Sequence, residues 1–205
     1  SKRTVTKPLP SFLLIAIVKI IYLIYNILYK QKLPEATERY VRGRNAEARR
    51  ASRRTVNGED MKVAIGCDHG GINLKEAVIK AVTEQGMEYE DFGTYTDESV
   101  DYPDYAEKVG RAVASSAADL GVVLCGTGIG ISIAANKIKG IRCAHVTDAF
   151  QAEMCRQHND ANVLAMGGRI TSPEDAYKFT KIFLTTPFAG GRHLRRVEKI
   201  AALEK

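Results

Sequence analysis

Short apolar runs alternate with segments of helical periodicity along residues 61–205, and this alternation narrows the fold more than any other feature of the sequence. The runs that we predict as strands are 63–67, 87–92, 120–125, 141–146 and 162–166. A helix is expected after each of them, with Pro103, Asp148 and Ser172 near three of the starts and Gly86 at one of the ends. Strands that alternate with helices form a parallel sheet covered on both faces.

Five such strands predict an α/β fold. We expect a three-layer, Rossmann-like, doubly wound parallel sheet of order 2-1-3-4-5, followed by a C-terminal helix over 193–203. In sheets of this kind the ligand lies in the crevice beyond the carboxyl ends of strands 1 and 3. The polar segments Asp68–His69 and Cys125–Gly130 directly follow these two strands. The topology therefore predicts a binding site where the two segments meet.

The turn after the third strand reads Cys-Gly-Thr-Gly-Ile-Gly, from Cys125 to Gly130. Its glycines let backbone N–H groups approach an anion closely at the start of a helix. The spacing is not GxGxxG, and no ribose-binding acid stands about twenty residues later, so a nicotinamide cofactor is not expected. A simple tight strand–helix turn is the alternative interpretation.

Cys125 is the best candidate for a reactive group in this turn. It ends an apolar run one step before a helix N-terminus, where a thiolate is stabilised, so we predict an accessible thiol. An inert core thiol is the alternative. Cys67 has a comparable place, but the neighbouring Asp68 disfavours its thiolate. The chain has four cysteines without CxxC spacing, which favours a reducing compartment over a disulfide framework or a zinc site.

Three further polar groups are candidates for substrate contacts. Asp68 and His69 either cap the following helix or serve substrate hydroxyls and phosphate. His158 lies near the end of a predicted helix and is either solvated or a proton shuttle near neutral pH. Arg192 and Arg196 are four residues apart and can share one helical face. Two guanidinium groups suit a phosphate dianion, and a solvated charged face is the alternative.

Charge and hydropathy divide the chain into two parts. Residues 1–60 carry 13 Lys and Arg against 5 Asp and Glu, whereas residues 61–205 carry 17 against 19. A nucleic-acid role for the second part therefore has no electrostatic support. Within the first part, segment 12–29 is apolar apart from Lys19 and Asn26 and just reaches the length of a membrane-spanning helix. We predict a basic extension over 1–60, outside the fold, and a domain over 61–205.

Three interpretations of the extension stay open. It is a membrane anchor or targeting segment, a stretch joined to the domain by fusion or by an error in the gene assignment, or a tail that binds a partner. Membrane contact is expected only if segment 12–29 is genuine and retained. The domain itself is expected in the cytoplasm, or at a membrane or in an organelle if the extension is a targeting segment.

Four segments taken together indicate a family. They are Cys-Asp-His from Cys67, Cys-Gly-Thr-Gly-Ile-Gly-Ile-Ser-Ile-Ala-Ala-Asn-Lys from Cys125, Arg-Gln-His-Asn-Asp from Arg156, and Gly-Gly-Arg-His from Gly190. With them, residues 61–205 resemble the ribose-5-phosphate isomerase B family, which also holds galactose-6-phosphate isomerase. The resemblance implies an aldose–ketose isomerase without metal or other cofactor. It also implies a homodimer or homotetramer whose active sites are shared between two subunits.

The resemblance also implies roles for individual residues. Cys125 matches the base that moves a proton between C1 and C2 of the sugar through a cis-enediolate. His158 matches the acid/base that opens the furanose ring, and Thr127 assists the opening. The backbone of Gly126, Gly128, Ile129 and Gly130 would stabilise the oxyanion. The remaining matches are sugar contacts at Asp68, Tyr102 and Asn159, and residues at or near the phosphate at His69, Arg169, Arg192 and Arg196.

Two comparisons with branches of the family that the chain resembles narrow the choice of substrate. Some relatives use a glutamate base at the position of Ile131, which cannot act as a base here, so the chain resembles the cysteine type. The galactose 6-phosphate branch lacks the Arg-Gln-His-Asn and Gly-Gly-Arg-His segments, which are intact in this chain. Interconversion of D-ribose 5-phosphate and D-ribulose 5-phosphate is therefore expected. Isomerisation of a hexose 6-phosphate (allose or galactose 6-phosphate) is the alternative, and a non-catalytic sugar-phosphate-binding protein is a third.

Overall fold

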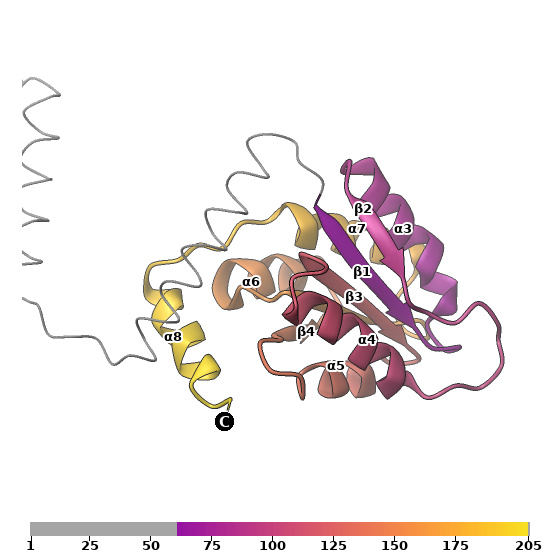
Figure 1. Ribbon diagram of the computed structural model, residues 1–205. Helices are drawn as coiled ribbons and strands as arrows, with labels where there is room; N and C mark the ends of the chain where they lie inside the picture. Colours follow the sequence, from indigo (N-terminus) through magenta and orange to yellow (C-terminus); the bar gives the residue numbers. More distant parts are fainter. Residues whose placement is uncertain (1–60, 205) are drawn as a thin grey trace, which may run out of the picture. The chain divides into compact units, whose positions relative to one another are not determined.

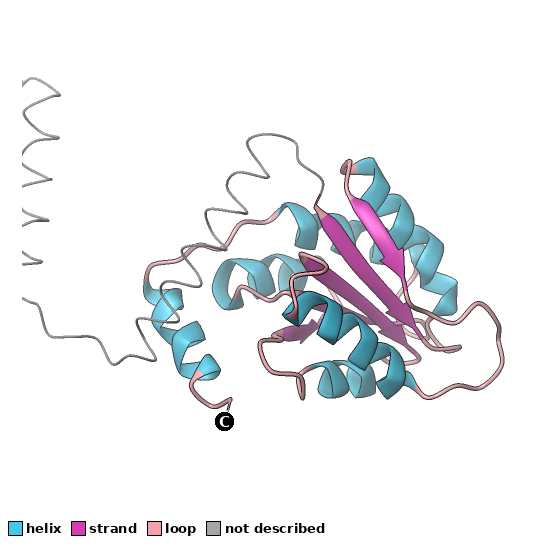
Figure 2. Ribbon diagram, in the orientation of Figure 1, coloured by secondary structure: helices cyan, strands magenta, loops and turns pink. Residues whose placement is uncertain are grey.

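The computed structural model describes residues 61–204, and these form an α/β sandwich (Figures 1 and 2). The predicted extension over 1–60, with its apolar segment 12–29, lies outside the described residues. The strands are β1 (Lys62–Cys67), β2 (Glu88–Asp91), β3 (Leu120–Cys125), β4 (Cys143–His145) and β5 (Val163–Gly167). The helices are α3 (Lys75–Glu84), preceded by the 3₁₀ turn η1 (Ile72–Leu74), α4 (Tyr102–Ala114), α5 (Ile129–Ala135), α6 (Ala149–Asn159), α7 (Pro173–Thr185) and α8 (Arg192–Ala201).

The predicted three-layer fold is confirmed. All strand pairs are parallel, and successive side chains of each strand point to opposite faces of the sheet. One face packs Val63, Ile65 and Leu124 against α3, α6 and α7, and the other packs Ala64 and Val123 against α4 and α5. Because both faces are buried, the central strands read as continuous apolar runs rather than as alternating ones.

The order of the last two strands was predicted wrongly. The sheet runs β2-β1-β3-β5-β4, so β5 pairs with β3 and β4 is the edge strand. All five residues of β5 are buried, whereas the three residues of β4 are only half-buried. The predicted strand 141–146 shrinks to Cys143–His145 because an edge strand has a partner on one side only. The crevice beyond β1 and β3 is unaffected, because those two strands are neighbours in either order.

Two of the predicted helix starts are capped by side chains. Asp148 Oδ1 accepts the Gln151 N–H at 2.7 Å at the start of α6, and Ser172 Oγ accepts the Asp175 N–H at 3.0 Å at the start of α7. Pro103 lies in the first turn of α4, where the absence of its N–H is harmless. None of the helices between residues 61 and 204 combines the length and apolar character needed to cross a bilayer.

Candidate active site

The turn after β3 forms around the Cys125 sulfur. Gly128 has φ of +77°, a left-handed conformation that glycine adopts without strain, and its N–H donates a hydrogen bond to Cys125 Sγ at 3.1 Å. The turn thus aims a backbone donor at the sulfur. The side chain is only 4% exposed in a single chain, contrary to the accessible thiol that the sequence predicted. The reason is that Cys125 points onto the sheet face beneath α5 and is packed within the apolar cluster there.

Three loops meet at the carboxyl edge of the sheet: the two that the topology predicted, after β1 and β3, and the loop after β5. Asp68 N–H donates to Leu124 O at 3.1 Å, which joins the loop after β1 to the end of β3. Gly168 N–H donates to Cys125 O at 2.8 Å, which adds the loop after β5. The approach is so close that a Cβ on Gly70 would lie 2.8 Å from the Gly126 nitrogen. The backbone itself therefore brings these loops together.

The polar side chains of this edge surround the glycine turn. Asp68 is 5% exposed and accepts the Gly70 N–H at 2.8 Å, so its carboxylate closes a local turn and does not cap the following helix. Thr127 is exposed and its Oγ1 accepts the Ile129 N–H at 3.4 Å. Because Oγ1 accepts there, the Thr127 O–H remains available as a donor.

His69, Tyr102 and Arg169 reach the same edge. His69 Nδ1 accepts the Val100 N–H at 3.2 Å, which fixes the imidazole against the loop before α4. The Tyr102 ring lies over Gly130, and a Cβ there would be 2.7 Å from it. The Arg169 guanidinium would be 3.2 Å from a Cβ on Gly126. These residues and the turn make up what we call the carboxyl-edge group: Asp68, His69, Tyr102, Cys125, Gly126, Thr127, Gly128, Ile129, Gly130 and Arg169.

The other predicted residues lie at the opposite edge of the sheet. We call His158, Asn159, Arg192 and Arg196 the amino-edge group: the first two end α6 and the others lie one turn apart on α8. The chain passes from α6 into β5 through Asn162, whose carbonyl oxygen accepts the N–H of Gly121 near the start of β3. Cys125 lies four residue steps further along β3 than Gly121, a distance of about 13 Å at the rise of a β-strand. One chain therefore does not bring the two groups together.

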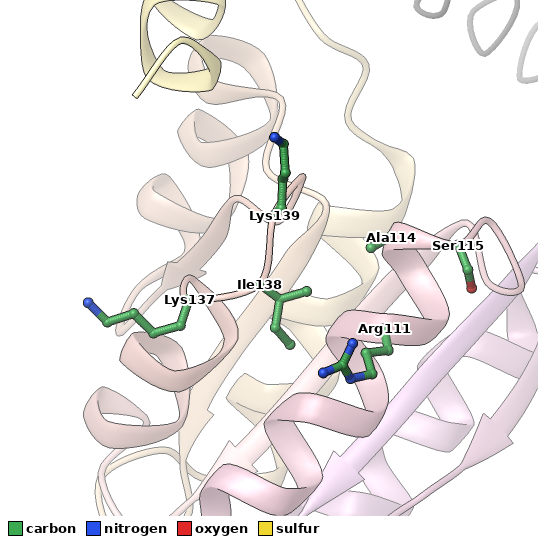
Figure 3. A pocket seen from close by; sticks show the side chains of 6 residues that line it. All are labelled: Arg111, Ala114, Ser115, Lys137, Ile138 and Lys139. Atoms are coloured by element: carbon green, nitrogen blue, oxygen red, sulfur yellow. The ribbon is translucent and has the colours of Figure 1, made fainter. Parts of the chain in front are cut away.

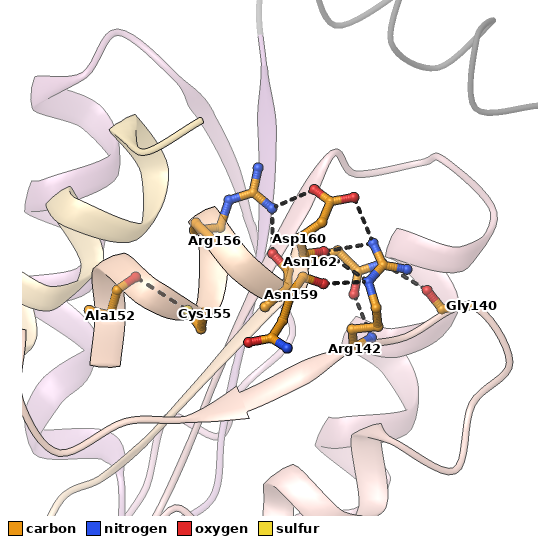
Figure 4. A network of polar contacts seen from close by, with 9 residues as sticks. Gly140, Arg142, Ala152, Cys155, Arg156, Asn159, Asp160 and Asn162 are labelled. Carbon is orange, nitrogen blue, oxygen red and sulfur yellow. Dashed lines mark hydrogen bonds and ion pairs between the residues drawn. The ribbon is translucent and has the colours of Figure 1, made fainter. Parts of the chain in front are cut away.

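A buried ion network holds the end of α6 (Figure 4). Asp160 has φ of +47° and ends the helix in the left-handed conformation. Its carboxylate lies between two guanidinium groups, with Arg142 at 3.0 Å and Arg156 at 3.2 Å. Arg142 Nε also donates to Asn159 O at 3.0 Å and to Asp160 O at 2.9 Å. These bonds satisfy carbonyl groups that a helix end leaves without partners, and they fix the backbone that carries His158.

The sequence analysis assigned no role to His193, which belongs to the amino-edge group by its contacts. Its ring stacks on that of His158 with centroids 4.2 Å apart and planes 4° apart. Burial lowers the pKa of His193, and the positive charges of His158, Arg192 and Arg196 lower it further. The signal in the sequence is spacing: His193 and Val197 are four residues apart and are both buried, while Arg192 and Arg196 are exposed.

Comparison with known proteins identifies the family to which the domain belongs. A sequence model described as Ribose/Galactose Isomerase matches residues 63–200. The chain belongs to the ribose/galactose isomerase family. Ribose-5-phosphate isomerase B of Escherichia coli is 46% identical over 144 residues, which is 70% of this chain and 97% of that protein. In both cases the match covers the domain and leaves out the extension.

Two solved structures of the family have the same fold. The Clostridium thermocellum ribose-5-phosphate isomerase B superposes with a TM-score of 0.68 at 51% identity, covering 70% of this chain and 97% of that one. The type B ribose 5-phosphate isomerase of Trypanosoma brucei gives 0.67 at 49% identity, covering 71% and 99%. The chain thus spans almost the whole length of these family members.

The other cysteines of the domain differ from Cys125 in their surroundings. Burial raises the pKa of Cys67 to about 11, and Asp68, which the sequence analysis held responsible, is the smallest of the causes. Burial also raises the pKa of Cys155 to about 11 and that of Cys143 further. These three thiols stay protonated at neutral pH. Cys125 is the cysteine whose sulfur accepts a hydrogen bond from the glycine turn.

Two further observations concern the part of the domain that the structure describes. Within residues 61–204, no three His, Cys, Asp or Glu side chains gather as they would around a metal ion. A surface hollow of about 580 Å³ lies between the end of α4 and the segment after α5 (Figure 3). It is lined by Arg111, Ala114, Ser115, Lys137, Ile138 and Lys139, none of them a predicted site residue. The hollow is therefore separate from both groups of predicted residues.

Proposed function

We propose that the domain over residues 61–205 interconverts D-ribose 5-phosphate and D-ribulose 5-phosphate. The observation that carries the proposal is the Cys125 sulfur, which accepts a hydrogen bond from the Gly128 N–H at 3.1 Å inside a turn that the loops after β1 and β5 flank. Membership of the ribose/galactose isomerase family supports it, since the E. coli relative is a ribose-5-phosphate isomerase B.

The reaction needs two operations, because the two sugars differ in form. In ribose 5-phosphate the C4 hydroxyl closes a furanose ring on C1, so the ring must open before the carbonyl exists. Ribulose 5-phosphate has its carbonyl at C2, and the hydroxyl that would close a furanose ring on it is esterified. It is therefore open-chain. Ring opening is needed on the ribose side only, while proton transfer is needed in both directions.

Proton transfer is assigned to the carboxyl-edge group. The Cys125 thiolate takes the proton from C2, and the electron pair moves through the C1–C2 bond to O1 to give a cis-enediolate. A proton passes from O2 to O1, and the thiol returns its proton to C1, so that no atom or electron is gained or lost. The backbone N–H groups of 126–130 hold the negative charge, as donors in oxyanion holes do. The sequence of steps calls on no metal or cofactor.

Ring opening is assigned to the amino-edge group together with Thr127. The ring opens when its oxygen gains a proton and the C1 hydroxyl loses one. His158 is assigned as the acid/base because imidazole is the side chain most often used for proton transfer, and the Thr127 O–H assists. Binding roles are assigned by position: Asp68, Tyr102 and Asn159 contact the sugar, and His69, Arg169, Arg192 and Arg196 hold or lie near the phosphate.

We further propose that each active site is shared between two copies of the chain in a homodimer or homotetramer. The separation of the two groups supports this, because protons do not pass directly over about 13 Å of strand. Apolar residues beside the glycine turn offer a surface for the second copy. Ile129 and Ile133 lie one turn apart on α5 and are 53% and 56% exposed.

The test separates the two operations by isotope exchange. The full chain is incubated with ribulose 5-phosphate in D₂O, and deuterium entering C1 is followed by NMR. This exchange requires the enediolate but not ring opening. Conversion of ribose 5-phosphate requires both. We expect Cys125→Ala to lose both activities and still to bind substrate, and His158→Ala to lose conversion while it keeps exchange.

Two outcomes would overturn the proposal. An active Cys125→Ala variant would remove the assigned base, and a folded wild-type chain that binds ribose 5-phosphate without turnover would identify a non-catalytic sugar-phosphate-binding protein. The family description also names galactose, so a hexose 6-phosphate is the second candidate substrate. A higher kcat/KM for allose or galactose 6-phosphate than for ribose 5-phosphate would favour that candidate.

A further inference from the structure

The stacked rings of His158 and His193 have a property that ring opening can use. Ring centroids 4.2 Å apart and planes within 4° of parallel leave the His158 ring little freedom to tilt. An acid/base works only if its nitrogen points along the line to the proton that it transfers. His158 ends α6 and is only half-buried, so a second surface is needed to hold its plane.

His193 is itself held firmly. Its side chain is buried, with 8% of the residue exposed. Its backbone N–H donates to Gly190 O at 3.0 Å where α8 begins. The fully buried Val197 anchors the same face of α8 one turn later. The Ala189 N–H donates to Gln157 O at 3.0 Å, which joins the segment before α8 to the end of α6. The two rings are therefore tied together through the backbone as well as by their own contact.

We propose that His193 is a positioning residue, an uncharged flat platform that fixes the plane of the His158 imidazole for opening the furanose ring. This inference rests on the proposed function and assigns a residue to which neither the sequence nor the resemblance gave a role. His193 acts through His158 and is not itself assigned to the substrate.

The hydrogen bonding of His193 agrees with an uncharged ring. Arg192 Nε donates to His193 Nε2 in a long contact of 3.5 Å, and a nitrogen that accepts a hydrogen bond carries no proton. The charged groups that act on the ring are His158 from α6 and Arg192 and Arg196 from α8, all cationic when protonated. Together with burial they lower the pKa of His193. The platform ring is therefore the uncharged member that the proposal requires.

The experiment compares two substitutions at His193 in the full chain. His193→Phe keeps a flat ring that is never charged, whereas His193→Ala removes the platform. Each variant is measured for conversion of ribose 5-phosphate and for deuterium exchange into ribulose 5-phosphate. We expect His193→Ala to lose about tenfold in kcat for conversion, a part of the roughly hundredfold or more that a general acid contributes. Exchange should stay near the wild-type rate, and His193→Phe should recover most of the conversion.

The controls distinguish this inference from the proposed function. Lys199→Ala, exposed on the same helix, should leave both rates unchanged. If His193→Ala and the wild type convert ribose 5-phosphate with equal kcat, the positioning role of His193 is overturned. A His193→Phe variant as slow as His193→Ala, or a folded His193→Ala variant that loses exchange together with conversion, would overturn it as well. Failure of the proposed function would show instead in Cys125→Ala, through exchange that persists without the thiol.

Discussion

The carboxyl-edge group and the amino-edge group are built in different ways. At the carboxyl edge the backbone forms the site: Gly128 turns its N–H onto Cys125, and Gly70 lets a second loop touch Gly126. At the amino edge side chains form it, with Asp160 bound between two arginines and His158 resting on His193. Under the proposed function, the first arrangement would hold reacting atoms rigidly around an anion, and the second would hold a group that exchanges protons.

The largest effect is expected from combining a defect in each group. Cys125→Ala and His158→Ala should each be inactive in converting ribose 5-phosphate. If sites are shared between subunits, a mixture that exchanges subunits contains hybrid dimers with one complete site, made of the wild-type Cys125 of one chain and the wild-type His158 of the other. Random pairing should restore about a quarter of the wild-type activity.

The measurement is the rate after the two variants are unfolded together, refolded and compared with each variant refolded alone. A mixture of Cys125→Ala with Cys125→Ser is the matched control and should stay inactive. If the Cys125→Ala and His158→Ala mixture also stays inactive although native mass spectrometry detects hybrid dimers, the groups are not shared in the proposed way.

A smaller loss of activity is expected when a methyl group is added to the glycine turn. Gly128→Ala puts a Cβ 2.6 Å from the His145 ring, at φ of +77°. Gly86 is the control, since it has φ of +70° with nothing within 4 Å of a Cβ. Gly86→Ala should lower the free energy of unfolding by about 1 kcal/mol through left-handed strain, and Gly128→Ala should lower it further because of the clash. Only Gly128→Ala should also lose activity, by about a hundredfold, because it displaces a donor to the anion.

Kinetics and urea unfolding of the two variants test this difference. Loss of exchange and conversion to the same extent in Gly128→Ala would place the damage at the carboxyl edge. Equal activity of the two variants would mean that the turn tolerates displacement of Gly128, against the role assigned to its N–H.

Much of the fold could be predicted because local patterns report burial. The strands β1, β3 and β5 are continuous apolar runs since both faces of the sheet are covered, and the caps Asp148 and Ser172 mark helix starts directly. The positions of β4 and β5 in the sheet could not be read in this way, because strand order depends on packing between distant segments. A hint was present: the segment 163–166 is wholly apolar, whereas Arg142 directly precedes β4 and His145 lies within it.

The position of the crevice could also be predicted, because the carboxyl ends of parallel strands lie at one edge of the sheet. The loops after β1 and β3 had to meet there, and they do. The burial of Cys125 could not be predicted, since it depends on the face to which the last residue of β3 points. The stack of His193 on His158 joins residues 35 positions apart on two helices, and no local pattern in either helix contains it.

The ion network at the end of α6 tests how the amino edge keeps its shape. Asp160→Asn retains a residue that tolerates the left-handed conformation but removes the charge between Arg142 and Arg156. Because the carboxylate is 12% exposed, we expect the free energy of unfolding to fall by about 2 kcal/mol. Conversion of ribose 5-phosphate should slow by about tenfold, with deuterium exchange preserved.

The control is the exposed ion pair between Glu107 and Arg111, which has the same spacing along a helix. Glu107→Gln should change stability by less than about 0.5 kcal/mol and leave both rates unchanged. Urea unfolding and the two kinetic assays give the comparison. Loss of exchange in Asp160→Asn would show that the network supports the carboxyl edge as well, and the two groups would not be independent.

The smallest effect concerns the pH dependence of stability. The pKa of His193 is lowered from its ordinary value of about 6.5, so the unfolded chain binds a proton more readily than the folded one. The stability due to its uncharged form is fully present above the pKa of the unfolded chain. It is lost as the pH falls below that value and through the lower pKa of the folded chain. His193→Phe removes the titration, so its free energy of unfolding should decrease less than that of the wild type between about pH 8 and about pH 5. Urea unfolding at the two pH values measures this decrease in the free energy of unfolding. The same measurement on His69→Phe, which removes a histidine at the carboxyl edge, is the comparison for His193→Phe. An equal decrease in the wild type and His193→Phe would mean that the folded chain protonates the His193 platform as readily as the unfolded chain does, and that the pair at the amino edge carries two charges.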